Sequence, residues 1–178
     1  MSSKDWQLDT VLEALLRDLP GLLAQAQREP QLLFVTGDIA NKARVDEYEA
    51  ARELFEALAG ATGIPGDRMF MVPGNHDVDR GQISRALQRS ERLMLEEVDE
   101  DEQALRDTLD EVFDDVDALR RHGQRFVNWC SFTDRVLGRA RSVSIDQPWR
   151  SDIVELAGIR VGVASLCTAW LSGAGDAR

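Results

Sequence analysis

The sequence of this chain predicts an α/β fold, because segments with strand character alternate with segments of helical periodicity. Short apolar runs at residues 32–35 and 69–72 each lead into a glycine-containing turn, and a helical pattern lies between them. This strand–helix–strand unit predicts two parallel strands joined by a right-handed crossover. The length of 178 residues suits one domain, and the apolar content of 43% is sufficient for a core.

Two helices are expected in the first sixty residues. Apolar residues recur at helical spacing over residues 8–19, and Pro20-Gly21 predicts an interruption directly after them. Residues 46–59 predict the crossover helix, with one apolar face turned inward. Gly60 is expected to end that helix, because glycine is the residue that most readily adopts the left-handed cap conformation.

The second half of the chain has a different pattern. Residues 82–140 read as helix only, and we interpret them as a helical insertion in a single domain over residues 1–178. Beyond them, Asp152–Leu156 and Ile159–Leu166 have strand character on either side of Ala157-Gly158. That arrangement predicts a β-hairpin with a tight turn.

The charge of the chain excludes some classes of function. The net charge is −11, from 32 acidic and 21 basic side chains, so a general binder of nucleic acids or of anionic membranes is not expected. The excess comes from the segment between Glu96 and Asp117, which carries twelve carboxylates against Arg106 alone. We interpret this segment as a solvated helix face and not as a calcium loop, because it lacks the glycine of an EF-hand.

The cysteines and the N-terminal residues predict a cytoplasmic setting. Cys130 and Cys167 lie far apart and form no CxxC pair, so no disulfide framework is expected. Residues 1–6 lack the basic and apolar regions of a signal peptide. No segment approaches the ~20 apolar residues of a membrane span.

Two polar motifs follow the two predicted parallel strands. Val35-Thr36-Gly37-Asp38 ends the first strand, and Val72-Pro73-Gly74-Asn75-His76-Asp77 ends the second. Ligands of open α/β sheets bind outside the carboxyl ends of the strands, so both motifs should face one crevice. Carboxylate and amide oxygens suit Mn, Mg or Fe, and imidazole adds Zn. The sequence therefore predicts that these two turns form part of a metal site.

Together these motifs resemble the second and third motifs of the calcineurin-like metallophosphoesterases. The resemblance implies a pair of divalent metals (Mn, Fe or Zn), bridged by Asp38, with Asn75 bound to one of them. It further implies that His76 faces the substrate phosphate and helps to protonate the leaving group, with Asp77 orienting His76. Two metals about 3.5–4 Å apart can hold the attacking and leaving oxygens of a displacement.

The resemblance covers nearly the whole chain but only the central part of the family domain. The Asp-x-His motif that opens that domain and the histidines that close it are not found here, where the two histidines are His76 and His122. We therefore expect an incomplete metallophosphoesterase-type sheet sandwich, doubtful metal occupancy and self-association through unpaired backbone. His122, inside the helical segment, is expected to be a surface or capping residue.

Two functions from different classes are compatible with these observations. The first is metal-dependent hydrolysis of a phosphoester, with a phosphodiester or nucleotide as substrate, weak or absent in this chain. The second is a non-catalytic remnant or interaction module whose acidic helices contact a partner protein. The aromatic residues Phe126, Trp129 and Phe132 are expected to be core and not a stacking surface for bases, and Cys130 is expected to be inert.

Overall fold

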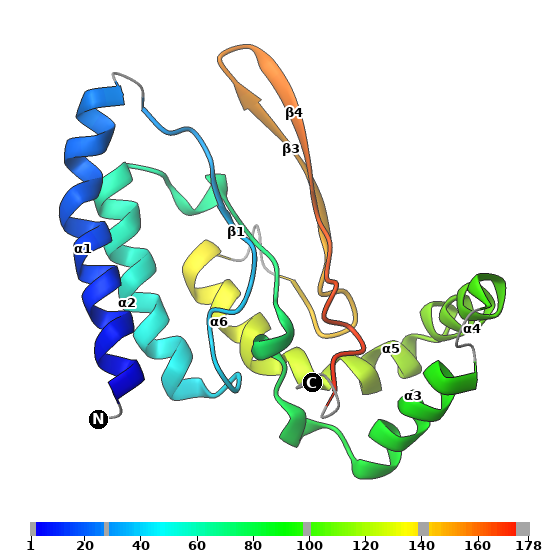
Figure 1. The fold of residues 1–178 in the computed structure, drawn as a ribbon. Helices are drawn as coiled ribbons and strands as arrows, with labels where there is room; N and C mark the ends of the chain where they lie inside the picture. Colours follow the sequence, from blue (N-terminus) through cyan, green and yellow to red (C-terminus); the bar gives the residue numbers. More distant parts are fainter. Residues whose placement is uncertain (1–2, 27–28, 98–100, 139–142, 174–178) are drawn as a thin grey trace.

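The computed structural model of the chain describes residues 3–26, 29–97, 101–138 and 143–173 (Figure 1). The helices are α1 (Ser3–Ala26), α2 (Val45–Thr62), α3 (Arg85–Glu97), α4 (Glu102–Asp114), α5 (Val116–Gly123) and α6 (Val127–Leu137). The strands are β1 (Leu33–Val35), β2 (Met69–Met71), β3 (Arg150–Leu156) and β4 (Ile159–Ser165). Short 3₁₀ turns lie at Gly66–Arg68 (η1), Asn75–Asp77 (η2), Arg80–Gln82 (η3) and Gln124–Phe126 (η4).

The predicted strand–helix–strand unit is confirmed. β1 and β2 pair in parallel, with Leu33 opposite Met69 and Val35 opposite Met71, and α2 connects them. All three residues of β2 are buried, which accounts for its continuous apolar sequence. The parallel pairing places the carboxyl ends of β1 and β2 side by side, where the two polar motifs begin.

The predicted interruption of the first helix is wrong. α1 is continuous from Ser3 to Ala26 and carries Pro20 inside it. Proline removes one hydrogen bond of the helix, but packing of an amphipathic helix against a neighbour can outweigh such a local preference. α1 packs along α2, and the two helices run side by side in Figure 1.

The predicted end of α2 at Gly60 is also wrong, by one turn. The helix continues to Thr62, and Gly63 caps it with a φ of 70° while its N–H donates to the carbonyl of Ala59 at 2.8 Å. Pro65 follows shortly afterwards and prevents the helix from continuing. Of the two glycines, the one that takes the left-handed conformation ends the helix.

The segment after β2 is helical in its described residues, as predicted. α6 packs against α2, and α4 packs against α5. The acidic side chains of α4 are exposed, which agrees with a solvated face, whereas residues 98–100 of the acidic run lie outside the described part. Interpreting residues 82–140 as an insertion stays a prediction.

The predicted hairpin is confirmed. β3 and β4 are antiparallel, with Leu156 opposite Ile159, and the chain reverses through Ala157 (φ 50°) and Gly158 (φ 82°). Two consecutive positive φ angles are typical of the hairpin turn that matches strand twist. In Figure 1 the hairpin extends away from the helices. Among the described residues the hairpin forms a sheet separate from β1–β2, so the predicted sandwich of sheets stays a prediction. The α/β class is confirmed by the parallel strand–helix–strand unit.

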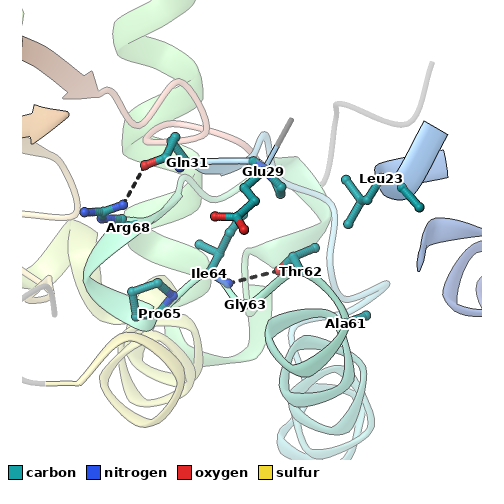
Figure 2. A pocket seen from close by; sticks show the side chains of 11 residues that line it. Leu23, Glu29, Gln31, Ala61, Thr62, Gly63, Ile64, Pro65 and Arg68 are labelled. Carbon is teal, nitrogen blue, oxygen red and sulfur yellow. Dashed lines mark hydrogen bonds between the residues drawn. The ribbon is translucent and has the colours of Figure 1, made fainter. Parts of the chain in front are cut away.

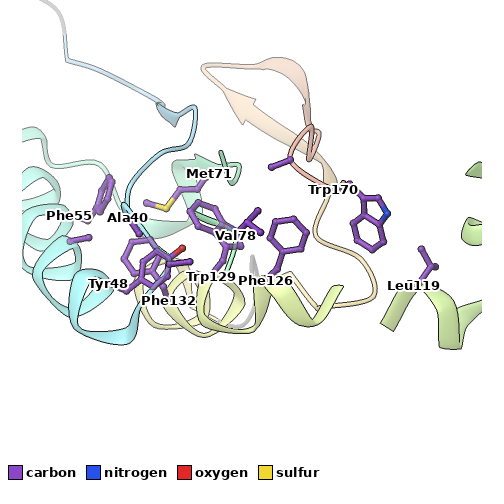
Figure 3. Close-up of a cluster of buried hydrophobic side chains, with 13 residues drawn as sticks. Ala40, Tyr48, Phe55, Met71, Val78, Leu119, Phe126, Trp129, Phe132 and Trp170 are labelled. Atoms are coloured by element: carbon purple, nitrogen blue, oxygen red, sulfur yellow. The ribbon is translucent and has the colours of Figure 1, made fainter. Parts of the chain in front are cut away.

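The hydrophobic core lies between α2, α6 and the carboxyl end of β2 (Figure 3). Tyr48 of α2 stacks on Phe132 of α6 with ring centroids 5.0 Å apart, and Phe126 stacks on Trp170 at 6.0 Å. Phe126 and Trp129 are completely buried, so the prediction that this aromatic stripe is core is confirmed. The loops that carry the polar motifs rest on this core through Ala40 and Val78.

His122 was predicted to be a surface or capping residue, and the surface alternative is wrong. His122 is buried at the end of α5, and its Nδ1 lies 2.5 Å from Oε1 of Glu91 in α3. The same carboxylate pairs with the guanidinium of Arg125, which is completely buried and also donates to the carbonyls of His122 and Ser172. The hydrogen bonds to Glu91 explain the burial, since charged side chains are buried when they are paired.

No helix within the described ranges is both long enough and apolar enough to cross a membrane.

Candidate functional site

The two polar motifs converge, as their positions after parallel strands predict. The backbone N–H of His76 donates to Oδ1 of Asp38 at 3.1 Å, although 38 residues separate them in the sequence. Just before them, the N–H of Val72 donates to the carbonyl of Val35 at 3.1 Å, which prolongs the β1–β2 pairing to the start of both turns. Asp38, Asn75 and His76 therefore share one edge of the parallel sheet.

Close approach of the two turns requires glycine in both. A Cβ on Gly37 would lie 2.5 Å from the backbone nitrogen of Gly74, and Gly37 also has a φ of 105°. A Cβ on Gly74 would lie 2.1 Å from Oδ1 of Asp38. The space that a side chain would fill is thus occupied by the backbone and carboxylate of the opposite turn.

Asp38 has an unusual backbone conformation. Its φ is 56°, in the left-handed region that non-glycine residues seldom occupy, and its side chain is exposed. Such a conformation costs on the order of 1–3 kcal/mol and clusters at functional sites, where the surrounding structure maintains it. Here the hydrogen bond to the N–H of His76 and the contact with Gly74 hold the carboxylate beside the second motif.

Asp77 is a buried residue whose side chain links the two motifs through hydrogen bonds. Its Oδ1 accepts the N–H of Ala40 at 2.9 Å and the hydroxyl of Tyr48 at 3.1 Å. Its Oδ2 accepts the N–H of Gly74 at 3.0 Å and that of Ile39 at 3.3 Å. Burial raises the pKa of this carboxyl, and the four hydrogen bonds oppose that rise by favouring the charged form.

These contacts correct the expected role of Asp77. We expected its carboxylate to orient the ring of His76, but both of its oxygens are directed to the backbone of the two turns and to Tyr48. The ring of His76 is positioned instead by the carbonyl of Asn41, 3.1 Å from Nδ1. Asp77 therefore acts on the site through the loop backbones.

The contact with Asn41 defines the tautomer of His76. A backbone carbonyl can only accept a hydrogen bond, so Nδ1 carries the proton. Nε2 then has its lone pair available in the neutral ring, or a second proton in the charged ring. It makes no hydrogen bond with the described residues, and the side chain is exposed. The ring can thus present Nε2 to a bound ligand.

Tyr48 belongs to the site although its position in the sequence predicts only core. Its ring packs between Trp129 and Phe132, while its hydroxyl donates to Asp77. Burial and the neighbouring Asp77 carboxylate raise the pKa of Tyr48, so the hydroxyl remains a donor. The helical spacing that buries Tyr48 in α2 does not reveal this second contact, and neither does any spacing reveal the carbonyl of Asn41.

The donor set suits a divalent cation but does not complete a metal pair. Asp38 supplies carboxylate oxygen and Asn75 supplies amide oxygen, ligands that Mn or Mg accepts. In the part of the chain that the structure describes, no group of three or more His, Cys, Asp or Glu side chains could hold a metal ion. The residues therefore fit part of a metal site, and a pair would need further ligands.

Two cavities lie at opposite ends of the β1–β2 sheet. The larger, of about 620 Å³, is lined by residues that precede the strands, among them Gln31 and Arg68, which are hydrogen-bonded at 2.9 Å (Figure 2). The smaller, of about 370 Å³, is lined by Asn75, His76 and the cationic side chains of Lys42, Arg44 and Arg80. Because it adjoins the converging motifs, the smaller cavity is the candidate ligand site, and its volume suits a small molecule.

Comparison with known proteins agrees with this geometry. Neither a curated protein nor a solved structure matches the chain significantly. A model of the calcineurin-like phosphoesterase family matches residues 5–160, which include both motifs and most of the described elements. The chain therefore belongs to the calcineurin-like phosphoesterase family.

Proposed function

We propose that this site takes part in the metal-dependent hydrolysis of a phosphoester. The observation that supports the proposal best is the juxtaposition of Asp38 with the Asn75-His76 turn, through the 3.1 Å hydrogen bond to Oδ1. Asp38 and Asn75 would hold divalent metal, which supplies charge neutralisation and an activated water when bound. His76 would face the phosphate through Nε2, while Asn41 holds the other side of the ring.

A phosphodiester or a nucleotide is the proposed substrate class. The cavity beside His76 is open and lined by polar side chains, which suits a small phosphorylated molecule. Hydrolysis by this chain alone should be slow, because the described residues provide only two side-chain oxygen donors in the proposed metal site. Metal binding and turnover should depend on the same carboxylate.

Manganese binding to the whole chain tests the proposal directly. We expect wild-type protein to bind Mn²⁺ weakly, as measured by loss of the free-ion signal in electron paramagnetic resonance. Asp38→Asn should lower the affinity at least about tenfold, since the carboxylate charge is removed. Asp67→Asn is the matched control, because Asp67 is an exposed aspartate beside the other end of the sheet.

A parallel assay follows hydrolysis of bis-p-nitrophenyl phosphate with and without a chelator. Any hydrolysis should require Mn²⁺ and should disappear in Asp38→Asn but not in Asp67→Asn. His76→Ala should retain most of the Mn²⁺ affinity, since His76 is not a proposed ligand. Rapid hydrolysis that a chelator leaves unchanged, or equal Mn²⁺ affinity in wild type and Asp38→Asn, would contradict the proposal.

A non-catalytic interaction role is the second candidate, and the surface of α4 favours it. Glu102, Asp107, Asp110, Glu111 and Asp114 are all exposed on this one helix. Such a face could contact a basic partner protein without any metal. Failure of wild-type protein to bind Mn²⁺ at all, with the fold intact, would favour this role over the first.

A further inference from the structure

One guanidinium group at the cavity beside His76 has a nitrogen donor without an acceptor among the described residues. Nε of Arg80 is buried and makes no hydrogen bond with the described residues. Arg80 lines the cavity together with Asn75 and His76. An unsatisfied buried donor destabilises the folded state, more so when it is charged, and native structures seldom retain one without a reason. An anion bound in the cavity would pair with the positive charge of the Arg80 side chain that lines it.

The surroundings of Arg80 also favour an anion. Lys42 and Arg44 line the same cavity, although Arg44 is paired with the exposed Asp46 at 3.0 Å. One carboxylate lines it too, that of Asp79. Its oxygens already accept hydrogen bonds from Gly81, Gln82 and Asn128, at 3.0–3.1 Å. The cavity thus concentrates positive charge in a chain whose net charge is −11.

We propose that Arg80, assisted by Lys42, binds a second anionic group of the substrate, beside the phosphate that faces His76. The substrate class is then a phosphoester that carries a further phosphate group, such as a nucleoside diphosphate or triphosphate. This inference rests on the proposed function and narrows its substrate. A planar guanidinium suits the task because it can donate two parallel hydrogen bonds to one phosphate.

Substitution of Arg80 should leave the fold intact. Its side chain has no hydrogen bond or ion pair with the described residues to lose. Its backbone carbonyl, which accepts Nε2 of Gln88 at 3.1 Å, is retained in any variant. Arg80→Gln and Arg80→Lys are therefore informative variants, and Arg68→Gln, at the opposite cavity, is the matched control.

Calorimetric titration with inorganic pyrophosphate and with orthophosphate, in the presence of a chelator, tests the inference. Wild-type protein should bind pyrophosphate about tenfold more tightly than orthophosphate. Arg80→Gln should lose that tenfold preference, which corresponds to one bidentate ionic contact. Arg80→Lys should retain part of the preference for pyrophosphate, because the positive charge remains but the planar group with two parallel donors is lost. Arg68→Gln should retain the whole preference.

Three results would overturn the inference. They are equal affinity of wild type for the two anions, an unchanged preference in Arg80→Gln, or an equal loss in Arg68→Gln. Melting curves confirm that each variant is folded. Because the titration contains no metal, its outcome is independent of Mn²⁺ binding at Asp38. Failure of this inference is therefore distinguishable from failure of the proposed function.

Discussion

The carboxylate of Asp77 accepts the backbone N–H of Ala40 at 2.9 Å, across 37 residues of sequence, in a completely buried position. The same carboxylate accepts the N–H of Gly74 in its own turn. One side chain thus joins the loop after β1 to the loop after β2. The positions of Asp38 and His76 relative to each other depend on these hydrogen bonds of Asp77.

Asp77→Asn should destabilise the protein by about 2–4 kcal/mol. Asparagine keeps one acceptor oxygen and replaces the other with an NH₂ group. The two donors that face this NH₂ group would lose their acceptor in the variant, and each unsatisfied donor costs about 1–3 kcal/mol. Urea denaturation measures the change. Asp67→Asn should change stability by less than about 0.5 kcal/mol, and Tyr48→Phe should show an intermediate loss because it removes one of the four donors. A neutral effect of Asp77→Asn would contradict the assigned contacts.

Gly74→Ala should impair the site more than its backbone conformation suggests. The φ of Gly74 is −94°, which alanine tolerates, but the added Cβ would lie 2.1 Å from Oδ1 of Asp38. The carboxylate must therefore move. We expect Mn²⁺ affinity to fall at least as far as in Asp38→Asn. Gly81→Ala is the control, since its Cβ would meet only Oδ1 of Asp79 at 3.2 Å. Full Mn²⁺ affinity in Gly74→Ala would contradict the close approach of Gly74 to the carboxylate of Asp38.

Glu91→Gln should destabilise the protein by about 3 kcal/mol or more, because it leaves the buried guanidinium of Arg125 without its carboxylate. The control lies on the same helix. Glu96 pairs with Arg92 at 3.7 Å on an exposed surface, so Glu96→Gln should change stability by less than about 0.5 kcal/mol. Thermal and urea unfolding measure both. Equal effects of the two substitutions would mean that Glu91 is solvated.

The two cysteines should make the protein less stable at alkaline pH. Burial raises the pKa of the Cys130 thiol to about 12 and that of the Cys167 thiol to about 11, from an ordinary value of 9.0. The folded state then retains protons that the unfolded chain releases. The stabilisation is fully present below pH 9 and is lost as the pH rises toward 11–12.

This loss should amount to about 1 kcal/mol per thiol between pH 7 and pH 10, measured by urea denaturation. A Cys130→Ala/Cys167→Ala double variant should show a smaller decline over the same range. Modification of the native thiols by an aromatic disulfide at pH 8 should be more than about 100-fold slower than in urea, since the thiolate is the reactive form. Rapid labelling of both half-buried thiols in the native protein would contradict their raised pKa values.

Alanine at Gly60 and at Gly63 should have opposite effects. Gly60 lies inside α2, and a Cβ added there would have no atom within 4 Å, so Gly60→Ala should stabilise the protein by about 0.4–1 kcal/mol. Gly63 has a φ of 70°, so Gly63→Ala should destabilise it by about 1–2 kcal/mol. The midpoints of urea unfolding give both values. The reverse order would place the end of the helix at Gly60.

The sequence predicts helix boundaries and burial less well where packing competes with a local preference. Pro20 has a strong intrinsic tendency to end a helix, yet α1 continues past it against α2. His122 follows two arginines in the sequence, which suggests a surface position. Yet it is buried, and its ring pairs with Glu91 from another helix. In both cases the deciding contact comes from a segment that is distant in the sequence.

The sequence by itself determined the strand–helix–strand unit, the hairpin and the pairing of Asp38 with the Asn75-His76 turn. Each depends on local periodicity, on glycine at a turn, or on the rule that parallel strands end at the same edge. Only the tertiary structure decided which partners Asp77 takes, which carbonyl holds His76 and that Arg80 lacks a partner among the described residues around its cavity. These depend on backbone groups and side chains that packing brings together, and no spacing along the chain encodes them.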